Sequence, residues 1–511
     1  MTKTAEVYNV PRGTAYITSQ QVLLYAVYFI FYVVLARILS QKDVGIVGAL
    51  ALVQAVFSGL ISGSLPLAAT RFISRSIVSG DPESASGVAR ATLKMSLALA
   101  IPGLLIAGLV SPFLTGFLDG AANPTNLLLG TFIASVFLDL TLLYTAFFLG
   151  VGRYVQTLYQ NAVYVPLSRG LGLALAYFGY GVFGIVIGWT VGAAATVLLS
   201  VYLWHGQLPK AKPYPLKPIL AFSLPVFASA LITLGQQWGD IGIIQVLLGP
   251  MTLAPYYLAV SSVNFLSILW MPVNQAIYPA LSAGHSTGDL REVSDRLAAA
   301  FRLTNLTVLP VSAALAAISP TALDAVFPSS YTGAALAFSI LSLSSIFVAQ
   351  GVLLVTTLQA VGHTRQYLAV TLVSSLIFIG FVGATALPLG TLAGALGRAL
   401  LSLLIVLLAR RSLHREISTH VNSAISKALP LAAGVALPLF VLDQLFLYYH
   451  PFRAVFQLVI LMVIFVIAYG GLSSLLRVFH HGDFAMLHDV LPRRLRPYLK
   501  MIQRIMLGGS Q

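Results

Sequence analysis

Long apolar runs constrain this chain more than any other feature of its sequence. A helix needs about 20 mostly apolar residues to cross the ~30 Å hydrocarbon core of a membrane. Fourteen runs of this kind follow one another, joined by segments too short to form a soluble domain. Their approximate limits are 14–39, 45–70, 93–111, 125–149, 154–177, 182–204, 218–248, 254–281, 297–318, 333–360, 367–386, 390–409, 428–447 and 454–476. The sequence therefore predicts an all-α polytopic membrane protein with about 14 transmembrane helices.

The composition excludes several other classes of protein. Charged residues make up 9% of the chain, whereas soluble globular proteins carry about 25%. The chain has no Cys, which rules out disulfides, thiolate metal sites and Cys nucleophiles. The opening segment MTKTAEVYNVPRGTAY is polar and has no small-residue cleavage site, so no cleaved signal peptide is expected.

The distribution of positive charge predicts the orientation in the membrane. With the N-terminus in the cytoplasm, 24 of the 29 Lys and Arg residues fall in cytoplasmic segments. Arg37, Lys42 and Arg453 fall at outer loops, and Arg169 and Arg398 fall within spans. By the positive-inside rule, we expect both termini in the cytoplasm. The net charge of +14 then reflects topology and attraction to anionic lipid head groups rather than a nucleic-acid interface.

An internal repeat divides the chain. The segment around Pro102 and Ser111-Pro112 recurs 208 residues later around Pro310 and Ser319-Pro320, and VGRYVQ (151–156) recurs as VGHTRQ (361–366). An even number of spans per repeat gives two six-helix lobes of parallel orientation. The prediction is an N-lobe at 1–209 (spans 1–6), a C-lobe at 210–412 (spans 7–12), two additional spans at 413–476 and a cytoplasmic tail at 477–511. The Pro-rich basic segment 205–218 is the expected inter-lobe linker.

Polar side chains recur at helical spacing in the first two spans of each lobe and predict a substrate cavity. Hydroxyls, amides and Tyr rings suit a sugar, which needs dispersed hydrogen bonds and flat stacking faces. The alternative is interhelical hydrogen bonding within a helix bundle. The candidate cavity residues are Gln20, Gln21, Tyr25, Tyr28, Gln54, Ser58, Thr233, Gln236, Gln237, Asn264, Asn274 and Gln275.

Four ionisable residues lie deep within predicted spans: Asp139, Arg169, Asp240 and Arg398. Each costs about 2.5–3.5 kcal/mol on insertion scales, so each is expected to be paired or to face water. Asp240 and Arg398 lie at similar depth and are predicted either to form a structural ion pair or to bind a coupling cation and a substrate phosphate. Asp139 and Arg169 are within reach of each other but less well matched in depth.

The region after the last span predicts a surface helix rather than an enzyme site. Residues 483–507 alternate apolar residues with Arg and Lys and are interrupted at Pro492 and Pro497, which is typical of an amphipathic helix pair on the inner leaflet. His480, His481 and His488 lack the Cys or carboxylate partners of a metal site. No acid/base or metal constellation occurs on an outer loop, so no catalytic residue, metal site or enzymatic activity is expected.

The segment LARILSQKDVGIVGALALVQAVFSGLISGSLPLAATRFISR (35–75) resembles a known family. Leu35-Ala36-Arg37 ends the first span, Gly45 closes a short loop, and Arg71 and Arg75 mark the inner edge of the second span. This pattern resembles the Wzx-like oligosaccharide flippases and polysaccharide biosynthesis export proteins of the multidrug/oligosaccharidyl-lipid/polysaccharide (MOP) superfamily. The resemblance implies a MATE-like arrangement of the two lobes. The lipid II flippase branch uses several cavity Arg residues, and the first span has none here before Arg37.

The resemblance implies a flippase that moves polyprenyl-linked oligosaccharide from the inner to the outer leaflet of the cell membrane by alternating access. A cation-coupled multidrug antiporter of the same superfamily is the alternative. No cofactor is expected apart from a coupling H⁺ or Na⁺. Expected partners are the lipid-linked oligosaccharide, membrane lipids and other polysaccharide or glycan assembly proteins, but not nucleic acid.

Overall fold

The structure is a computed structural model that describes residues 10–414, 421–449, 451–476 and 478. All regular elements in these ranges are helices, which confirms the predicted fold class. Eleven of the described helices are long and apolar enough to cross a membrane. The predicted amphipathic tail at 477–511, with its three His residues, lies outside the described residues except for Val478.

Two of the eleven helices are long enough to cross a membrane twice. Tyr154–Trp204 has 51 residues and Leu216–Leu269 has 54, whereas about 20 suffice for one crossing. Each contains a Gly whose backbone leaves the helical conformation, Gly179 (φ 98°) and Gly249 (φ 76°). Only Gly adopts such φ values without strain, so these positions mark the reversals between crossings. With the apolar segment Leu23–Ile38, the helices account for about fourteen spans.

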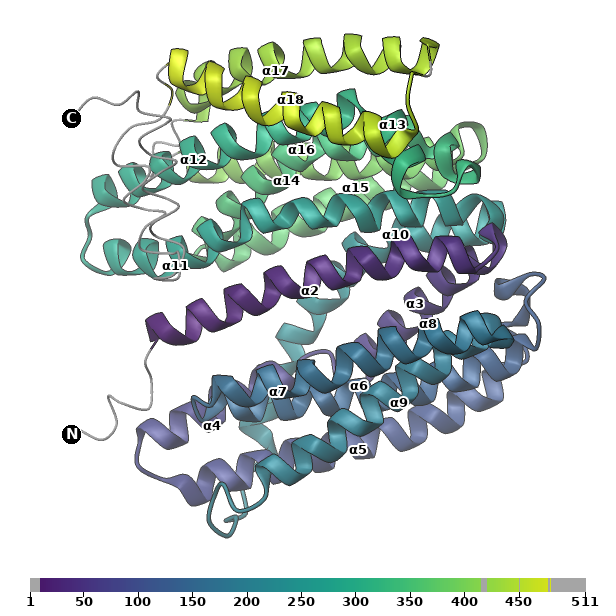
Figure 1. The fold of residues 1–511 in the computed structure, drawn as a ribbon. Coiled ribbons are helices and arrows are strands. Elements are labelled where there is room, and N and C mark those ends of the chain that lie inside the picture. Colours follow the sequence, from purple (N-terminus) through teal and green to yellow (C-terminus); the bar gives the residue numbers. More distant parts are fainter. Residues whose placement is uncertain (1–9, 415–420, 450, 477, 479–511) are drawn as a thin grey trace. The chain divides into compact units, whose positions relative to one another are not determined.

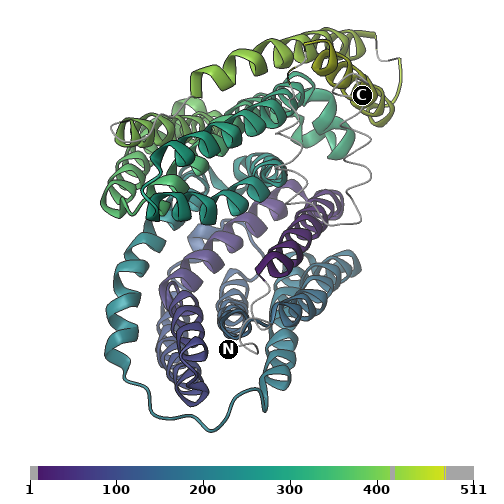
Figure 2. The same ribbon diagram turned by 90° about the vertical axis from the view of Figure 1, so that its left-hand side faces the viewer.

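The chain forms two compact units, Met1–Ala254 and Pro255–Gln511, and each is described here by itself. The boundary falls inside α10, whereas the repeat in the sequence places the lobe boundary at 209/210, which stays a prediction. Residues 205–215 of the predicted linker are non-helical and form a long loop between α9 and α10 (Figure 2), whereas its last three residues belong to α10.

The first unit is built around α6, which packs against α3, α4, α5 and α9 (Figure 1). Its helices are α2 (Val10–Ile38), α3 (Gln41–Ile61), α4 (Leu65–Val78), α5 (Pro82–Val110), α6 (Pro124–Gly150), α7 (Tyr154–Val165), α8 (Gly172–Leu175), α9 (Gly181–Trp204) and most of α10 (Leu216–Val263). Two π-helical turns, η2 (Pro166–Leu171) and η3 (Ala176–Tyr180), flank α8, and the 3-10 turn η1 (Thr115–Leu118) follows α5.

The second unit has α14 at its centre, in contact with α11, α12, α15 and α16. Its helices are α11 (Met271–Ser286), α12 (Leu290–Ala317), α13 (Ser319–Val326), α14 (Ala335–Ala360), α15 (Thr364–Leu389), α16 (Thr391–Leu413), α17 (Val421–Tyr449) and α18 (Ala454–Leu475), with 3-10 turns η4 (Asn264–Leu269) and η5 (Ser329–Ala334). The two additional spans, α17 and α18, pack on α12 and α13.

Two predicted spans are interrupted where the sequence indicated continuous helices. The span predicted at 45–70 breaks after Ile61 and resumes as α4, and the span predicted at 254–281 passes through η4 before α11 begins. Pro66 and Pro272 lie in the first turn of the resuming helices, where their missing N–H costs nothing. The first break falls at Ser62-Gly63-Ser64, where small and polar residues favour a turn inside the apolar run. The residues of η4 are mostly apolar, so hydropathy gave no sign of the second break.

The repeat seen in the sequence recurs in the turns. Gly152 and Gly362 have φ values of 78° and 79°, and the following N–H groups of Arg153 and His363 donate to the carbonyls of Phe148 and Leu358 at 2.8 Å in both cases. This is the Schellman-type helix end that Gly at positive φ permits. Gly181 and Gly390 mark a second pair of equivalent turns, with φ values of 54° and 58°.

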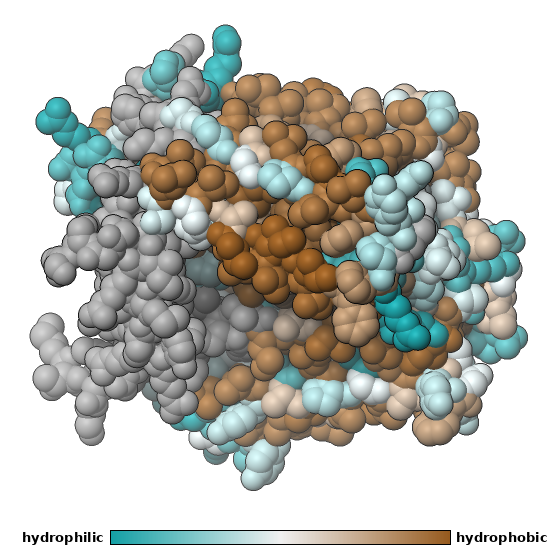
Figure 3. Space-filling model, turned by 45° about the horizontal axis from the view of Figure 1, so that its top comes forward, coloured by the Kyte–Doolittle hydropathy of each residue, from teal (hydrophilic) through white to brown (hydrophobic). Residues whose placement is uncertain are grey.

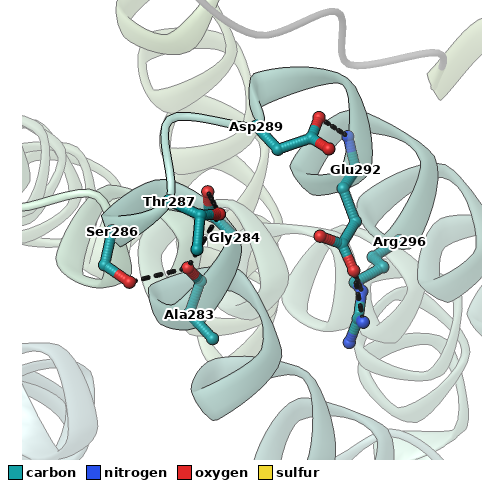
Figure 4. A network of polar contacts seen from close by, with 7 residues as sticks. All are labelled: Ala283, Gly284, Ser286, Thr287, Asp289, Glu292 and Arg296. Atoms are coloured by element: carbon teal, nitrogen blue, oxygen red, sulfur yellow. Dashed lines mark hydrogen bonds and ion pairs between the residues drawn. The ribbon is translucent and has the colours of Figure 1, made fainter.

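The turns that precede α5 and α12 are also equivalent. Asp81 and Asp289 each follow a Gly at positive φ and cap the next helix, accepting from the backbone N–H of Ser84 at 3.0 Å and of Glu292 at 2.9 Å. Bonds from the Ser84 hydroxyl and backbone lower the pKa of Asp81. Figure 4 shows the second turn, where the Arg296 guanidinium also donates to the Glu292 carboxylate.

In the coloured part of Figure 3, hydrophobic side chains form a broad central area, and hydrophilic side chains gather mainly toward the edges. Many large hydrophobic side chains are exposed, among them Leu109 (75%), Leu198 (72%) and Leu475 (78%). Soluble proteins rarely expose this much apolar area to water, whereas lipid chains can cover it without such a cost. The described residues are therefore those of a multi-pass membrane protein.

Candidate functional site

A buried carboxylate joins α3 to α6. Asp139 on α6 is 1% exposed, and its Oδ1 accepts hydrogen bonds from the Ser58 hydroxyl and, at 2.9 Å, from the Ser62 hydroxyl. Ser58 and Ser62 are one helical turn apart, so both hydroxyls reach the same oxygen. The second oxygen, Oδ2, has no hydrogen-bond partner among the described residues. This half-satisfied carboxylate can bind a proton or a cation.

A second deep charge, Arg169, lies against aromatic rings. Its guanidinium carbon is 5.0 Å from the ring centroid of Tyr28, 4.8 Å from that of Phe31 and 5.8 Å from that of Trp189. The faces of aromatic rings attract cations at these distances. Arg169 lies in the π-helical turn η2, a type of helix distortion that is frequent at functional sites. Rings from α2 and α9 thus stabilise a positive charge inside a span.

The candidate residues on α2 and α3 differ in exposure. Gln21 is exposed, while Tyr25, Tyr28 and Gln54 are partly buried. The side chain of Gln20 lies outside the described residues. The Ser58 hydroxyl donates to Asp139 on another helix. This is the interhelical hydrogen bonding that was the alternative to a substrate cavity.

The candidates on the following helices are mostly accessible. Thr233, Gln237 and Asn264 are exposed, and Gln236, Asn274 and Gln275 are partly buried. The Thr233 hydroxyl donates to the carbonyl of Ser229 in its own helix at 3.1 Å, a bond that keeps its oxygen available as an acceptor. The assignment of this set to one substrate cavity stays a prediction.

Asp240 and Arg398 belong to different units. Asp240 on α10 is fully buried and Arg398 on α16 is partly buried, and both take part in polar interactions. Their predicted pairing stays a prediction.

The structure reveals buried polar groups that sequence reasoning missed. Asp443 on α17 is fully buried although it lies close to the end of a predicted span. Gln350 donates to Asn305 at 2.7 Å between α14 and α12, and Gln160 donates to Ser200 at 2.8 Å between α7 and α9. A lone Asp in an apolar run was the available signal for Asp443, and an amide within a predicted span was the signal for Gln160 and Gln350. No group of three His, Asp or Glu residues that could hold a metal occurs in the described ranges.

The apolar helices and the exposed apolar surface define the class of protein, a polytopic membrane protein. Alignment with solved structures shows that it has the fold of MOP-superfamily transporters. Residues 10–285 match the family model described as polysaccharide biosynthesis protein. The chain therefore belongs to the polysaccharide biosynthesis protein family, which confirms the resemblance seen in the sequence. No curated protein matches the sequence.

Solved structures share the fold at low sequence identity. A lipid II flippase, MurJ, in an inward closed conformation aligns with TM-score 0.66 and 14% identity, covering 89% of this chain and 98% of its own. An inward-facing multidrug resistance MATE family transporter of the MOP superfamily aligns with TM-score 0.61 and 18% identity, covering 76% and 95%. A MOP-superfamily transporter from Pyrococcus furiosus aligns with TM-score 0.54 and 16% identity, covering 80% and 95%.

Proposed function

We propose that this protein moves polyprenyl-linked oligosaccharide from the inner to the outer leaflet of the cell membrane. The observation that carries the proposal is the match of more than half of the chain to a polysaccharide biosynthesis family. The flippase structure also covers 89% of the chain, compared with 76% for the MATE family transporter. Alternating access of two helical lobes supplies the movement without covalent chemistry.

The distribution of Lys and Arg supports the orientation of this proposal. Both termini lie in the cytoplasm, so the basic segments face the inner leaflet, from which the lipid-linked sugar is taken up. Cations there attract the phosphate that joins the sugar to its polyprenyl carrier.

A cation-coupled multidrug antiporter is the second candidate function. The alignment with a multidrug resistance MATE family transporter and the buried carboxylates Asp139 and Asp240 favour it. An intramembrane carboxylate can exchange a proton or Na⁺ for a cationic drug.

Deletion of the gene in the source organism separates the two functions. We expect deletion to leave lipid-linked oligosaccharide on the inner leaflet, where an impermeant glycosidase added outside the cell cannot cleave it. Plasmid-borne protein should restore cleavage. Normal surface exposure of the sugar lipid in the deletion strain, together with a loss of ethidium efflux, would instead establish the antiporter.

A further inference from the structure

A row of exposed residues follows α5 from Arg90 to the C-terminal end of the helix. Arg90, Lys94, Ala98, Pro102, Ile106 and Val110 recur every four residues, and all six are exposed. Residues four apart form a ridge along a helix surface. This ridge therefore changes from basic at one end to apolar over the rest of its length.

Two hollows line this ridge and meet at Ala98. The first, of about 460 Å³, lies between Arg90 and Lys94 and the linker residues Lys212 and Tyr214. The second, of about 640 Å³, is an apolar groove that α5 forms with α3. Gly103 lies on the floor of the groove, where a Cβ would approach Ile61 Cδ1 to 3.1 Å.

The basic end has charge available for an anion. Lys212 pairs with Glu83 at 2.5 Å, and neither Arg90 nor Lys94 has an ion pair among the described residues. Pro102 also lacks the N–H that would bond the Ala98 carbonyl, so a hydrogen-bond acceptor is freed where the two hollows meet. Two cations and a carbonyl thus lie at the mouth of an apolar groove.

The equivalent ridge in the second unit is covered by helices. Leu306, Pro310, Ala314 and Ile318, each 208 residues after its counterpart on α5, are all buried. Three of them lie in apolar clusters with α17 and α18. The carbonyl that Pro310 frees, that of Leu306, accepts a hydrogen bond from the Tyr469 hydroxyl at 3.1 Å. The ridge on α12 is thus buried beneath α17 and α18, whereas no described helix covers the equivalent ridge on α5.

The dimensions favour a long isoprenoid chain over a membrane phospholipid. From Ala98 to Val110 the apolar part of the ridge extends ~18 Å at 1.5 Å per residue. A phospholipid chain covers about half of the ~30 Å hydrocarbon core, because it belongs to one leaflet. We propose that the α3–α5 groove binds the polyprenyl chain of a polyprenyl diphosphate carrier, with its phosphates at Arg90 and Lys94. This inference rests on the proposed function and adds to it a site for the lipid carrier.

Photocrosslinking tests the site without requiring transport. The probe is a diazirine-bearing polyprenyl diphosphate added to the purified full-length protein in nanodiscs of zwitterionic lipid. Ile106→Trp fills the groove, and Arg90→Gln with Lys94→Gln removes the phosphate partners. We expect each change to lower crosslinking roughly tenfold, the effect of losing about 1.4 kcal/mol of binding. Leu109→Trp, which is exposed on the same helix outside the groove, and Arg75→Gln are the matched controls and should crosslink as the wild type does.

Three results would overturn the inference. If Ile106→Trp leaves crosslinking unchanged, the probe binds outside the α3–α5 groove. Equal competition by phosphatidylglycerol and by unlabelled polyprenyl diphosphate would make the groove a general anionic-lipid site. Disulfide-linked dimers of Ile106→Cys, in a chain with no native Cys, would make it an interface between two copies. Failure of the wild-type protein to flip a sugar lipid in reconstituted vesicles would refute the proposed function, while the crosslinking result would still stand.

Discussion

At the scale of residues, Asp139 shows what a polar spacing can and cannot predict. Gln54, Ser58 and Ser62 recur every four residues, which correctly places them on one face of the α3 segment. Spacing does not reveal which neighbouring helix that face meets. The acceptor for both Ser hydroxyls is a carboxylate 81 and 77 residues away, and only the packing of α3 on α6 brings them together.

Replacement of Asp139 should separate hydrogen bonding from charge. Asp139→Ala leaves two buried hydroxyls without their acceptor and should lower the free energy of unfolding by about 1–3 kcal/mol. Asp139→Asn keeps the carbonyl oxygen that accepts from both Ser residues and should remain close to the wild type. The melting temperature of the purified protein in detergent measures both. Equal losses for Ala and Asn would mean that the charge, not the hydrogen bonds, stabilises the site.

At the scale of elements, the positions of the helices could be predicted because a hydrocarbon core of fixed thickness demands apolar runs of fixed length. The break at η4 could not, since its residues are mostly apolar, whereas Ser62-Gly63-Ser64 gave a turn signal for the break after α3. Close packing of one helix had a sequence signal in glycines spaced four residues apart, although the spacing did not show which neighbour they meet. Gly184, Gly188 and Gly192 on α9 form a row of small residues against α8 and its flanking π-helical turns, which permits backbone contact.

Gly188→Ala should destabilise this packing. A Cβ at Gly188 would lie 2.6 Å from both Cα and N of Gly172, backbone atoms that cannot rotate away. Overpacking of this kind should cost roughly 1–3 kcal/mol. Gly170→Ala is the control, because nothing lies within 4 Å of a Cβ there. Thermal unfolding in detergent should show a lower melting temperature for Gly188→Ala alone. A melting temperature equal to that of Gly170→Ala would contradict the close contact.

Tyr469 on α18 offers a test of how a membrane helix tolerates proline. Its hydroxyl donates to the Leu306 carbonyl that Pro310 leaves without an N–H. Tyr469→Phe should therefore cost ~1 kcal/mol in the wild-type chain. In a Pro310→Ala background the helix itself can satisfy the carbonyl, so the same change should cost less. A double-mutant cycle on unfolding free energies measures the coupling, and strictly additive effects would remove this role of Tyr469.

At the scale of the whole molecule, the number of spans and their repeat could be predicted from hydropathy and recurring Pro and Gly residues. The repeat is visible again in turns with matching dihedral angles, as at Gly152 and Gly362. The docking of α17 and α18 on α12 could not be predicted, because an apolar face is the same sequence signal whether it meets lipid or another helix.

Topology can be tested by single-Cys labelling, since the chain has no native Cys. Ala122→Cys should react with an impermeant maleimide added outside the cell, and Pro213→Cys only after permeabilisation. Ala122 is preferable to the neighbouring Gly120, whose φ of 68° would strain a Cys and whose Cβ would meet Lys42. The opposite labelling pattern would reverse the proposed orientation of both termini.

Translocation of a sugar lipid by the purified protein is the most direct measurement of the central claim. Liposomes would carry a fluorescent polyprenyl diphosphate oligosaccharide in both leaflets, and an impermeant glycosidase would be added outside. In protein-free vesicles the enzyme cleaves only the outer pool. With the protein present, we expect the inner pool to become accessible and cleavage to approach completion while the vesicles stay sealed to a soluble dye. Cleavage that stops at the outer pool in sealed vesicles containing folded protein would contradict the flippase assignment.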